Sequence, residues 1–269
     1  METLPSGIRY RHWPAEGETR ATVVLVHGLG EHSGRYQALA SHFSGRGFAV
    51  IAPDHLGHGE SPGDRVYVDR FDDYLEGVRE CRQLMASLHP ERPCFLLGHS
   101  MGGLISARLL LEDQTFYRGA LLSGPAFAAE APPPAIVIWL GKLLSQIAPK
   151  MGMIELDAAG VSRDPAVVAD YQADPLVNHG KVTTRLSVEL LSAMERVLRA
   201  AGDITLPILL MHGAADAMAA PSGSQQFAET VGSHDLIFKL LPDMYHEIFN
   251  EPEGPQVIAE FADWIEARL

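Results

Sequence analysis

Short, uninterrupted runs of apolar residues recur along the chain and are bounded by glycine, proline, aspartate or serine. The runs occupy residues 23–26, 49–52, 95–97, 120–122, 208–211 and 236–241. Because apolar and polar residues do not alternate in them, the runs predict strands that are covered by helices on both faces, as in a parallel sheet.

The segments between these runs carry helical patterns. Apolar residues recur at helical spacing over residues 71–88 and 257–265. Alternating strands and helices predict an α/β fold with a mostly parallel central sheet flanked by helices. In such sheets ligands bind at the carboxyl ends of the strands, so functional residues are expected just after each strand.

One connection is too long for this pattern. About 80 residues separate Ser123 from Ile208, far more than a crossover needs. They comprise an apolar helix at 132–147, a polar segment at 162–174 and an amphipathic helix at 183–200. We interpret the last as a crossover helix and residues 126–179 as an inserted helical cap over the strand ends. Residues 1–125 and 180–269 then form the core.

Composition narrows the class of protein. The chain has 269 residues, 46% of them hydrophobic, and its 21 Lys+Arg against 34 Asp+Glu give a net charge of −13. This composition supports a sizeable core but disfavours nucleic acid as a partner. The first residues have no basic start or apolar stretch, and no apolar run approaches the length of about 18 residues that spans a bilayer. A soluble, cytoplasmic protein is expected.

Metal chemistry is not indicated. Cys81 and Cys94 fit no metal spacing and are interpreted as reduced, half-buried thiols. His55 and His58 have no carboxylate or cysteine at ligand spacing, so bracing of a turn is the better interpretation. We expect neither a metal nor another cofactor.

The strongest chemical signal is the G-x-S-x-G pattern around Ser100. Residues 94–103 read Cys-Phe-Leu-Leu-Gly-His-Ser-Met-Gly-Gly, with a predicted strand before the serine and a helical segment after it. A strand that turns directly into a helix crowds the backbone, and Gly98 and Gly102 relieve that crowding. The alternative is that these glycines merely make a tight turn. The flanking strand and helix favour a nucleophilic serine.

A nucleophilic serine needs a base, and the base needs an acid to orient it. His246 follows the last predicted strand, and Asp216 follows the strand before it. Asp243 is a rival acid but lies too close to His246 in sequence to orient it easily. The order Ser100, Asp216, His246 is that of the α/β-hydrolase sheet.

Five other histidines also lie near strand ends, inside glycine-rich turns where an imidazole more often braces the backbone. They are His27, His55, His58, His99 and His212.

An oxyanion formed at the serine needs backbone donors. The N–H of Met101 stands at the start of the helix, and Leu29, between Gly28 and Gly30 after an earlier strand, supplies the natural second N–H. The glycines of this loop do not form a dinucleotide-binding G-x-G-x-x-G.

Several stretches together resemble the monoacylglycerol lipase and lysophospholipase group of α/β-hydrolases. They are residues 26–36 (VHGLGEHSGRY), 54–61 (DHLGHGES), 98–103 (GHSMGG), 162–164 (SRD), 171–176 (YQADPL) and 245–247 (YHE). The resemblance spans nearly the whole chain. It implies hydrolysis of one acyl ester on a glycerol-like head group, with monoacylglycerol as the substrate. The alternative activity is that of a lysophospholipase or a broad short-chain carboxylesterase.

The resemblance also implies site residues. Leu29 and Met101 match the oxyanion hole, whereas Glu31, Arg35 and Tyr171 match positions near the polar end of the substrate site. From the residues alone, Glu31 and Arg35 could equally form an exposed i,i+4 ion pair, and Tyr171 could be cap packing. A catalytically silent receptor for an apolar ligand is the remote alternative, although all three triad residues are present.

The apolar segment at 132–147 is too short to span a membrane. It could contact membranes or micelles peripherally or pack within the cap. Lipid contact is favoured because the substrates of the resembled group reside in membranes and micelles.

Overall fold

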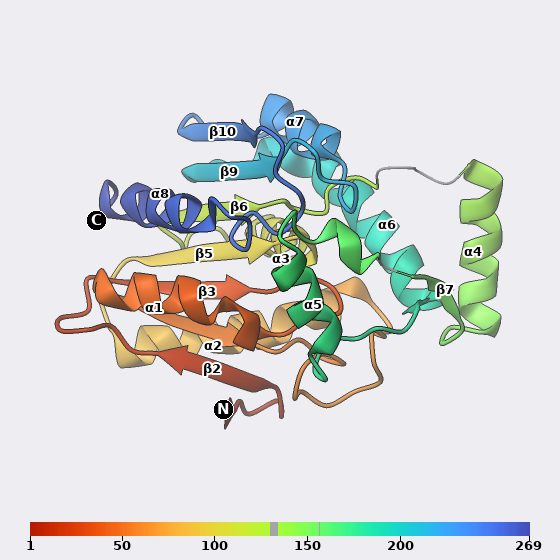
Figure 1. Cartoon of the computed structure of the whole chain (residues 1–269), viewed down its shortest axis with the longest axis horizontal. Helices are drawn as coiled ribbons and strands as arrows, with labels where there is room; N and C mark the ends of the chain where they lie inside the picture. The colour runs from red at the N-terminus through yellow and green to blue at the C-terminus, as the bar shows by residue number, and fades with distance from the viewer. Residues whose placement is uncertain (130–133, 156) are drawn as a thin grey trace.

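A mostly parallel sheet forms the centre of the molecule, as the sequence predicted (Figure 1). The computed structural model describes residues 1–129, 134–155 and 157–269. Within these residues the sheet has eight strands in the order β1-β2-β4-β3-β5-β6-β9-β10. From β4 to β10 all neighbours run parallel, whereas β1, β2 and β4 pair antiparallel. The strands are β1 (Glu2–Thr3), β2 (Arg9–Trp13), β3 (Ala21–Val26), β4 (Phe48–Pro53), β5 (Cys94–His99), β6 (Gly119–Ser123), β9 (Ile208–Gly213) and β10 (Leu236–Leu241).

Each of the six apolar runs is a strand of this sheet. Every residue of β3, β4, β5, β6 and β9 is buried, as expected where helices cover both faces. The same expectation is wrong for β10, which forms the outer edge of the sheet and leaves Ile237 and Leu240 37% and 43% exposed. An apolar run therefore predicts the strand but not its place in the sheet.

The first two strands were not predicted. β2 reads Arg-Tyr-Arg-His-Trp and is mostly half-buried, so it shows no continuous apolar run. It pairs antiparallel with β4, with Tyr10 opposite Pro53. A strand near the edge needs little apolar surface, and its sequence is correspondingly polar.

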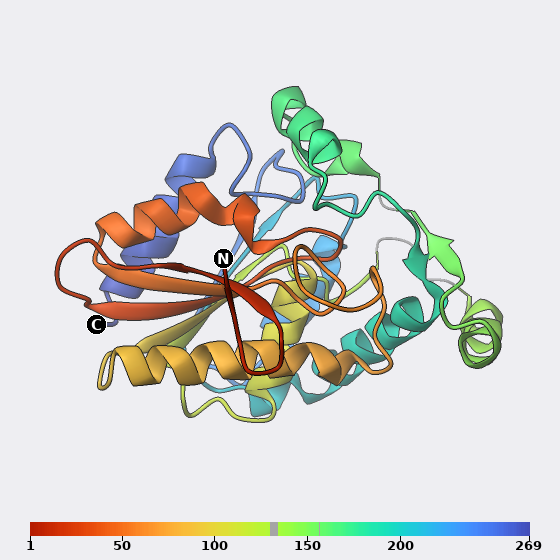
Figure 2. The same cartoon turned by 90° about the horizontal axis from the view of Figure 1, so that it is seen from below.

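Helices cover both faces of the sheet (Figure 2). One layer consists of α1 (Gln37–Gly45) and α8 (Gly254–Glu266), which pack on Phe48 and Phe95 through Phe43 and Trp264. The other face carries α2 (Leu75–Leu88), α3 (Met101–Leu110), α6 (Thr184–Ala200) and α7 (Pro221–Thr230). The predicted helices at 71–88, 183–200 and 257–265 are confirmed, the first beginning as the 3-10 turn η2 (Phe71–Tyr74).

The long connection between β6 and β9 carries several elements before α6. They are α4 (Ala135–Ile147), β7 (Gly152–Ile154), η3 (Ala158–Gly160), α5 (Pro165–Ala173) and β8 (Val182–Thr183). The predicted apolar helix at 132–147 corresponds to α4, although residues 132 and 133 lie outside the described residues.

Helix α5 was not predicted within the polar segment at 162–174. Its start is nevertheless marked in the sequence, because Asp164 accepts a hydrogen bond from the N–H of Ala166 and Pro165 occupies the first turn.

These inserted elements lie beyond the carboxyl ends of the parallel strands, where α4 stands apart from the sheet beside α6 (Figure 1). In the described residues, Gly141 of α4 faces Val188 of α6. No helix in residues 1–129, 134–155 and 157–269 combines the length and apolar character needed to cross a bilayer.

Candidate active site

Ser100 occupies a sharp turn between β5 and α3. Its φ of 54° and ψ of −121° lie in a region that costs a non-glycine residue about 1–3 kcal/mol. Backbone hydrogen bonds hold it there, since its N–H donates to the carbonyl of Ser123 at 3.0 Å and its carbonyl accepts from Gly103 and Ala126 at 2.9 and 3.0 Å. The turn fixes Ser100 at the carboxyl end of β5, where it lines a cavity.

Two glycines make this turn possible. A Cβ on Gly98 would overlap the carbonyl oxygen of Gly102, and a Cβ on Gly102 would overlap the carbonyl oxygen of Val26. The backbone of α3 thus lies directly against the ends of β3 and β5, as the motif predicted. No larger residue fits either position without displacing the main chain.

Asp216 and His246 meet at the same edge of the sheet. Asp216 follows β9, His246 follows the neighbouring β10, and His246 Nδ1 lies 2.6 Å from Asp216 Oδ2 with both side chains buried. Asp216 Oδ1 accepts the N–H groups of Met218 and Ala219 at 2.7 and 3.0 Å. The rival Asp243 lies on an exposed turn with a φ of 61°.

A second imidazole also contacts Asp216. The Nε2 atom of the buried His212 lies 3.0 Å from Asp216 Oδ2 and 3.0 Å from the carbonyl of Ala219, while its Nδ1 lies 2.6 Å from Ser224 Oγ. Sequence reasoning missed this contact, although the spacing of four residues between His212 and Asp216 was a signal for it. The aspartate is thereby fixed by neighbours on both oxygens.

The electrostatics of this cluster follow from burial and charge. Burial opposes ionisation of Asp216, but the charge of His246 and hydrogen bonds from both imidazoles outweigh it and lower the pKa of Asp216. Burial likewise opposes protonation of His246, but the charge and hydrogen bond of Asp216 raise the pKa of His246 above 6.5. The pKa of the adjacent His99 falls to about 3 through burial and the charge of His246.

The five histidines predicted to brace turns do contact backbone carbonyls. The contacts are His27 to Gly28, His55 to His27, His58 to Leu56, His99 to Ser123 and His212 to Ala219. For His212 the interpretation was incomplete because its ring also contacts Asp216.

A cavity of about 600 Å³ joins these residues to the inserted elements. Ser100, His246, Glu31 and Glu247 line its polar end. Its apolar wall includes Val161, Val182, Leu190, Leu191 and Met194. Among the described lining residues there is no lysine or arginine. The cavity lining therefore combines the polar groups around Ser100 with a mostly apolar wall, to which Glu155, Asp157 and Ser187 add further polar groups.

Leu29 and Met101 both line this cavity near Ser100. A Cβ built on Gly28 would lie 3.2 Å from Ser100 Cβ, which shows how closely the loop after β3 approaches the serine. Within the described residues, neither the N–H of Leu29 nor that of Met101 donates to another group. Both amides are thus available to a ligand.

Glu31 and Arg35 belong to a buried network. Arg35 Nη1 lies 3.0 Å from Glu31 Oε2, and Arg35 Nη2 lies 2.7 Å from Glu247 Oε2. Glu31 Oε1 accepts the N–H of Gly28 and the O–H of Tyr36, each at 2.6 Å. The interpretation of an exposed pair is wrong, because the side chains of Arg35 and Glu31 are only 11% and 4% exposed.

The pKa values of the two carboxylates in this network shift in opposite directions. Burial raises the pKa of Glu31 despite the opposing charge of Arg35. For Glu247, burial is outweighed by the hydrogen bond and charge of Arg35, so its pKa is lowered. Tyr171 of α5 also lines the cavity and stacks on Arg35, whose guanidinium carbon lies 4.7 Å from the ring centre.

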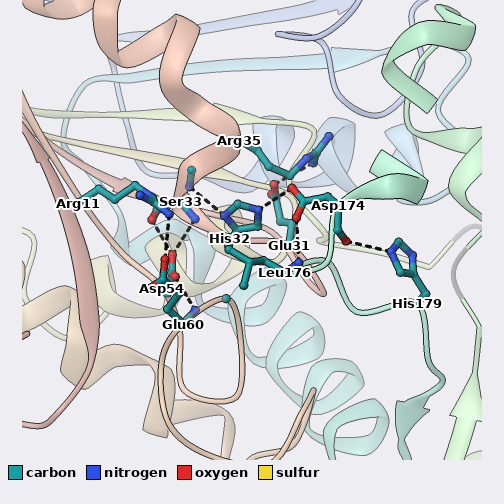
Figure 3. Close-up of polar contacts among 12 residues, drawn as sticks. Arg11, Glu31, His32, Ser33, Arg35, Asp54, Glu60, Asp174, Leu176 and His179 are labelled. Atoms are coloured by element: carbon teal, nitrogen blue, oxygen red, sulfur yellow. Dashed lines mark hydrogen bonds and ion pairs between the residues drawn. The ribbon is translucent and has the colours of Figure 1, made fainter. Parts of the chain in front are cut away.

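The segment after α5 is tied to the loop that carries Glu31. His32 Nε2 lies 2.8 Å from Asp174 Oδ2, and the N–H of Asn178 donates to the carbonyl of Gly30 at 2.7 Å. Figure 3 shows Asp174 between His32 and His179, with its backbone carbonyl 3.2 Å from His179 Nε2. These contacts hold the 174–179 segment against one rim of the site.

The segment before α5 is tied to the loop that carries His246. The N–H groups of His246 and Glu247 donate to the carbonyls of Gly160 and Val161, at 3.4 and 2.8 Å. Nearby, Arg163 Nε lies 2.8 Å from the buried Glu251 Oε2. The 162–164 motif thus anchors the insertion to the chain around His246.

The chain is similar to known lipases over most of its length. The sequence model of a family described as serine aminopeptidase S33 matches residues 17–253. The chain is 38% identical to a monoacylglycerol lipase of Mycolicibacterium smegmatis, an alignment that covers 98% of this chain and 95% of the relative. It is 34% identical to the monoglyceride lipase of Mus musculus, over 96% of this chain and 86% of the relative.

A solved structure agrees with these relatives. The monoacylglycerol lipase of Paleococcus ferrophilus superimposes with a TM-score of 0.88 at 32% identity, covering 97% of this chain and 99% of that one. The similarity therefore extends over the sheet and the inserted elements alike.

Replacing Arg35 tests the buried network. In Arg35→Met the carboxylates of Glu31 and Glu247 lose their shared cation, so the free energy of unfolding should fall by about 3–5 kcal/mol in urea titration at neutral pH. The matched control is Arg199→Met, which removes an i,i+4 pair with Glu195 on an arginine side chain that is 74% exposed. Its loss should be about 0–1 kcal/mol. Equally small losses would contradict a buried, mutually dependent network.

Proposed function

We propose that this chain, which belongs to the serine aminopeptidase S33 family, hydrolyses the ester bond of monoacylglycerols to glycerol and fatty acid. The resemblance to the monoacylglycerol lipase group, which was inferred from motifs, is confirmed by the relatives. The α/β-hydrolase fold, which was inferred from alternating strands and helices and from the order of the site residues, is confirmed by the sheet. The observation that carries the proposal is the cavity, which is lined by Ser100 and His246 and whose lining is otherwise mostly apolar. Such a shape fits one acyl chain attached to a small polar head.

In the proposed mechanism, Ser100 Oγ attacks the ester carbonyl carbon while His246 Nε2 takes the hydroxyl proton. The N–H groups of Leu29 and Met101 stabilise the oxyanion of the tetrahedral intermediate. His246 then gives the proton to the departing glycerol oxygen, which leaves an acyl ester on Ser100. Water, deprotonated by His246, attacks this ester, and His246 returns the proton to Ser100 Oγ as the fatty acid is released.

Asp216 orients the base in this scheme. Its Oδ2 accepts a hydrogen bond from His246 Nδ1–H, which leaves Nε2 as the nitrogen that exchanges protons with Ser100 and the leaving group. We assign His212 a supporting role, since its Nε2 contacts the same oxygen and its Nδ1 pairs with Ser224. The lowered pKa of Asp216 supports an ionised carboxylate throughout the cycle.

The glycerol head group is assigned to the end of the cavity near Glu31. Glu31 Oε2 accepts from Arg35 and has capacity for a second donor, such as a glycerol hydroxyl. Arg35 acts indirectly, by fixing Glu31 and Glu247 and by stacking on Tyr171. Tyr171 contributes cavity surface from the insertion.

Residues 126–179 are proposed to act as a cap on a core formed by residues 1–125 and 180–269. Their position beyond the carboxyl ends of the strands supports this division (Figure 1). Helix α4 is proposed to contact lipid, because Ile136, Trp139 and Ile147 are 62%, 60% and 74% exposed. Scattered exposed apolar residues need no explanation, but a contiguous set on one short helix favours an apolar partner surface.

A lysophospholipase or a short-chain carboxylesterase is the second candidate. A phosphate head group would meet Glu31 and Glu247 with no lysine or arginine among the described lining residues, which disfavours an anionic head. A short-chain ester would leave much of the apolar wall without contact, and so would gain less binding energy for orientation. A silent receptor is disfavoured by the complete set of Ser100, Asp216 and His246.

A substrate panel tests the proposed function. Monooleoylglycerol should show a higher kcat/KM than dioleoylglycerol, trioleoylglycerol, oleoyl-lysophosphatidylcholine or an acetyl ester, because the cavity accommodates one acyl chain and a small head. Ser100→Ala should lower turnover by ~10⁴-fold or more, and adding His246→Ala should lower it little further. Fatty-acid release would be followed by chromatography. A preference for triacylglycerol or lysophospholipid would overturn the substrate, and activity in Ser100→Ala would overturn the mechanism.

The pH dependence tests the roles of His246 and Asp216. Only neutral His246 acts as the base, so the acylation rate should rise with pH through one apparent pKa above 6.5 and then level off. Asp216→Asn removes the charge that raises this pKa while burial remains. The rise should therefore move to lower pH, and the plateau should drop. Single-turnover kinetics with a nitrophenyl ester measure both quantities, and an unchanged apparent pKa in Asp216→Asn would argue against the pair.

Surface variants of α4 test the lipid contact. Ile136→Ser with Trp139→Ser should reduce hydrolysis of monooleoylglycerol in phosphatidylcholine vesicles several-fold, because less apolar area enters the interface. The same variant should hydrolyse a dispersed short-chain ester as the original chain does. Leu88→Ser is the matched control, since Leu88 is 49% exposed on α2 and should affect neither substrate. Equal losses on both substrates would assign α4 to packing instead.

A further inference from the structure

The peptide that joins Gly28 to Leu29 has two polar ends with different neighbours. Its N–H belongs to Leu29 and faces no other donor or acceptor among the described residues, whereas its carbonyl belongs to Gly28 and lies 2.8 Å from His27 Nδ1. A peptide unit is planar, so a hydrogen bond that fixes the carbonyl also fixes the direction of the N–H. The contact with His27 therefore bears directly on where the Leu29 N–H points.

The direction of this hydrogen bond is set by a second contact. The backbone N–H of His55 donates to His27 Nε2 at 3.0 Å. Because Nε2 accepts this hydrogen bond, the neutral ring must carry its own hydrogen on Nδ1, which then donates to the carbonyl of Gly28. His55 Nε2 in turn lies 3.1 Å from the carbonyl of His27, so the two histidines brace each other.

Burial keeps His27 in this neutral form. The side chain is fully buried and its ring centre lies 4.0 Å from that of His55. Burial, followed by the neighbouring charge of His58, holds the pKa of His27 well below 6.5. On the other side of the same glycine, the N–H of Gly28 donates to Glu31 Oε1 at 2.6 Å. Both polar groups of Gly28 are thus occupied, and the loop has little rotational freedom.

We propose that His27 is a positioning residue for ester hydrolysis, because its Nδ1–H fixes the peptide whose N–H, on Leu29, stabilises the oxyanion. This inference rests on the proposed function, which assigns Leu29 to the oxyanion hole. A hydrogen bond at the carbonyl also polarises the peptide and strengthens its N–H as a donor. His27 acts entirely through Leu29 and contacts no reacting atom.

Two amide substitutions separate the two hydrogen bonds of His27. The amide nitrogen of Asn can occupy the position of Nδ1 and donate to Gly28, whereas Gln reaches toward the position of Nε2 and keeps only the contact with His55. The matched control is His58→Gln, which alters the same buried histidine cluster at a ring that bonds Leu56 and not Gly28.

Steady-state kinetics on nitrophenyl butyrate and the Ki of an aliphatic trifluoromethyl ketone test the proposal. The ketone forms a tetrahedral oxyanion on serine, so its Ki reports the oxyanion hole, whereas KM and the thermal midpoint report binding and folding. In His27→Gln, kcat should fall and Ki should rise by the same factor, about 10- to 100-fold, with KM nearly unchanged. His27→Asn should stay within a few-fold of the original chain, and His58→Gln should alter the midpoint without altering Ki.

Several results would overturn the proposal. They are an unchanged Ki in His27→Gln, an equal rise in Ki in His27→Asn, and an equal rise in His58→Gln. If His27→Gln does not fold, the decision falls to His27→Asn, in which a large rise in Ki would contradict donation through Nδ1. Failure of the proposed function is separate, because it would appear in the original chain as an absence of ester hydrolysis or of ketone inhibition.

Discussion

The left-handed turn at Ser100 is the constraint on which the rest of the site depends. For β5 to enter α3 without a loop, the helix must begin against the end of β3, and this contact excludes any side chain at Gly98 and Gly102. The same approach brings the loop after β3 to within contact of the serine. The strained turn at Ser100 therefore lies beside the loop after β3, a backbone segment that is remote in sequence. The hydrogen bonds around Ser100 compensate for the strain of the turn.

Buried charge is the second organising feature, and the buried ions beside the cavity are paired. Asp216 is surrounded by two imidazoles and two backbone N–H groups, while Arg35 lies between Glu31 and Glu247. In a low-dielectric interior such contacts are strong, and an unpaired member would be costly. Both clusters contribute to the cavity lining, one through His246 and the other through Glu31 and Glu247, so electrostatics as well as packing sets the geometry around Ser100.

Structural features that depend on neighbouring residues alone are visible in the sequence, and these features were predicted. The buried parallel strands appear as apolar runs, and the turn at Ser100 appears as paired glycines. Strand β2 is polar because it lies near the sheet edge, and α5 was hidden by the absence of a clear apolar stripe. Contacts between distant segments leave no such mark: Arg35 and Glu247 are 212 residues apart, and neither periodicity nor spacing indicates their pairing. The roles assigned to Ser100, Asp216 and His246 remain predictions.

The hydrogen bonds of Gly160 and Val161 with the backbone of His246 and Glu247 have a consequence for protein engineering. This part of the insertion shares its main-chain pairing with the loop after β10, and Arg163 adds an ion pair with the buried Glu251 of the same loop. The insertion is consequently not an exchangeable module with two clean junctions. A chimaera that imports the insertion of a relative must import the 245–253 segment with it, or the imidazole of His246 will lose the backbone support that holds it in register.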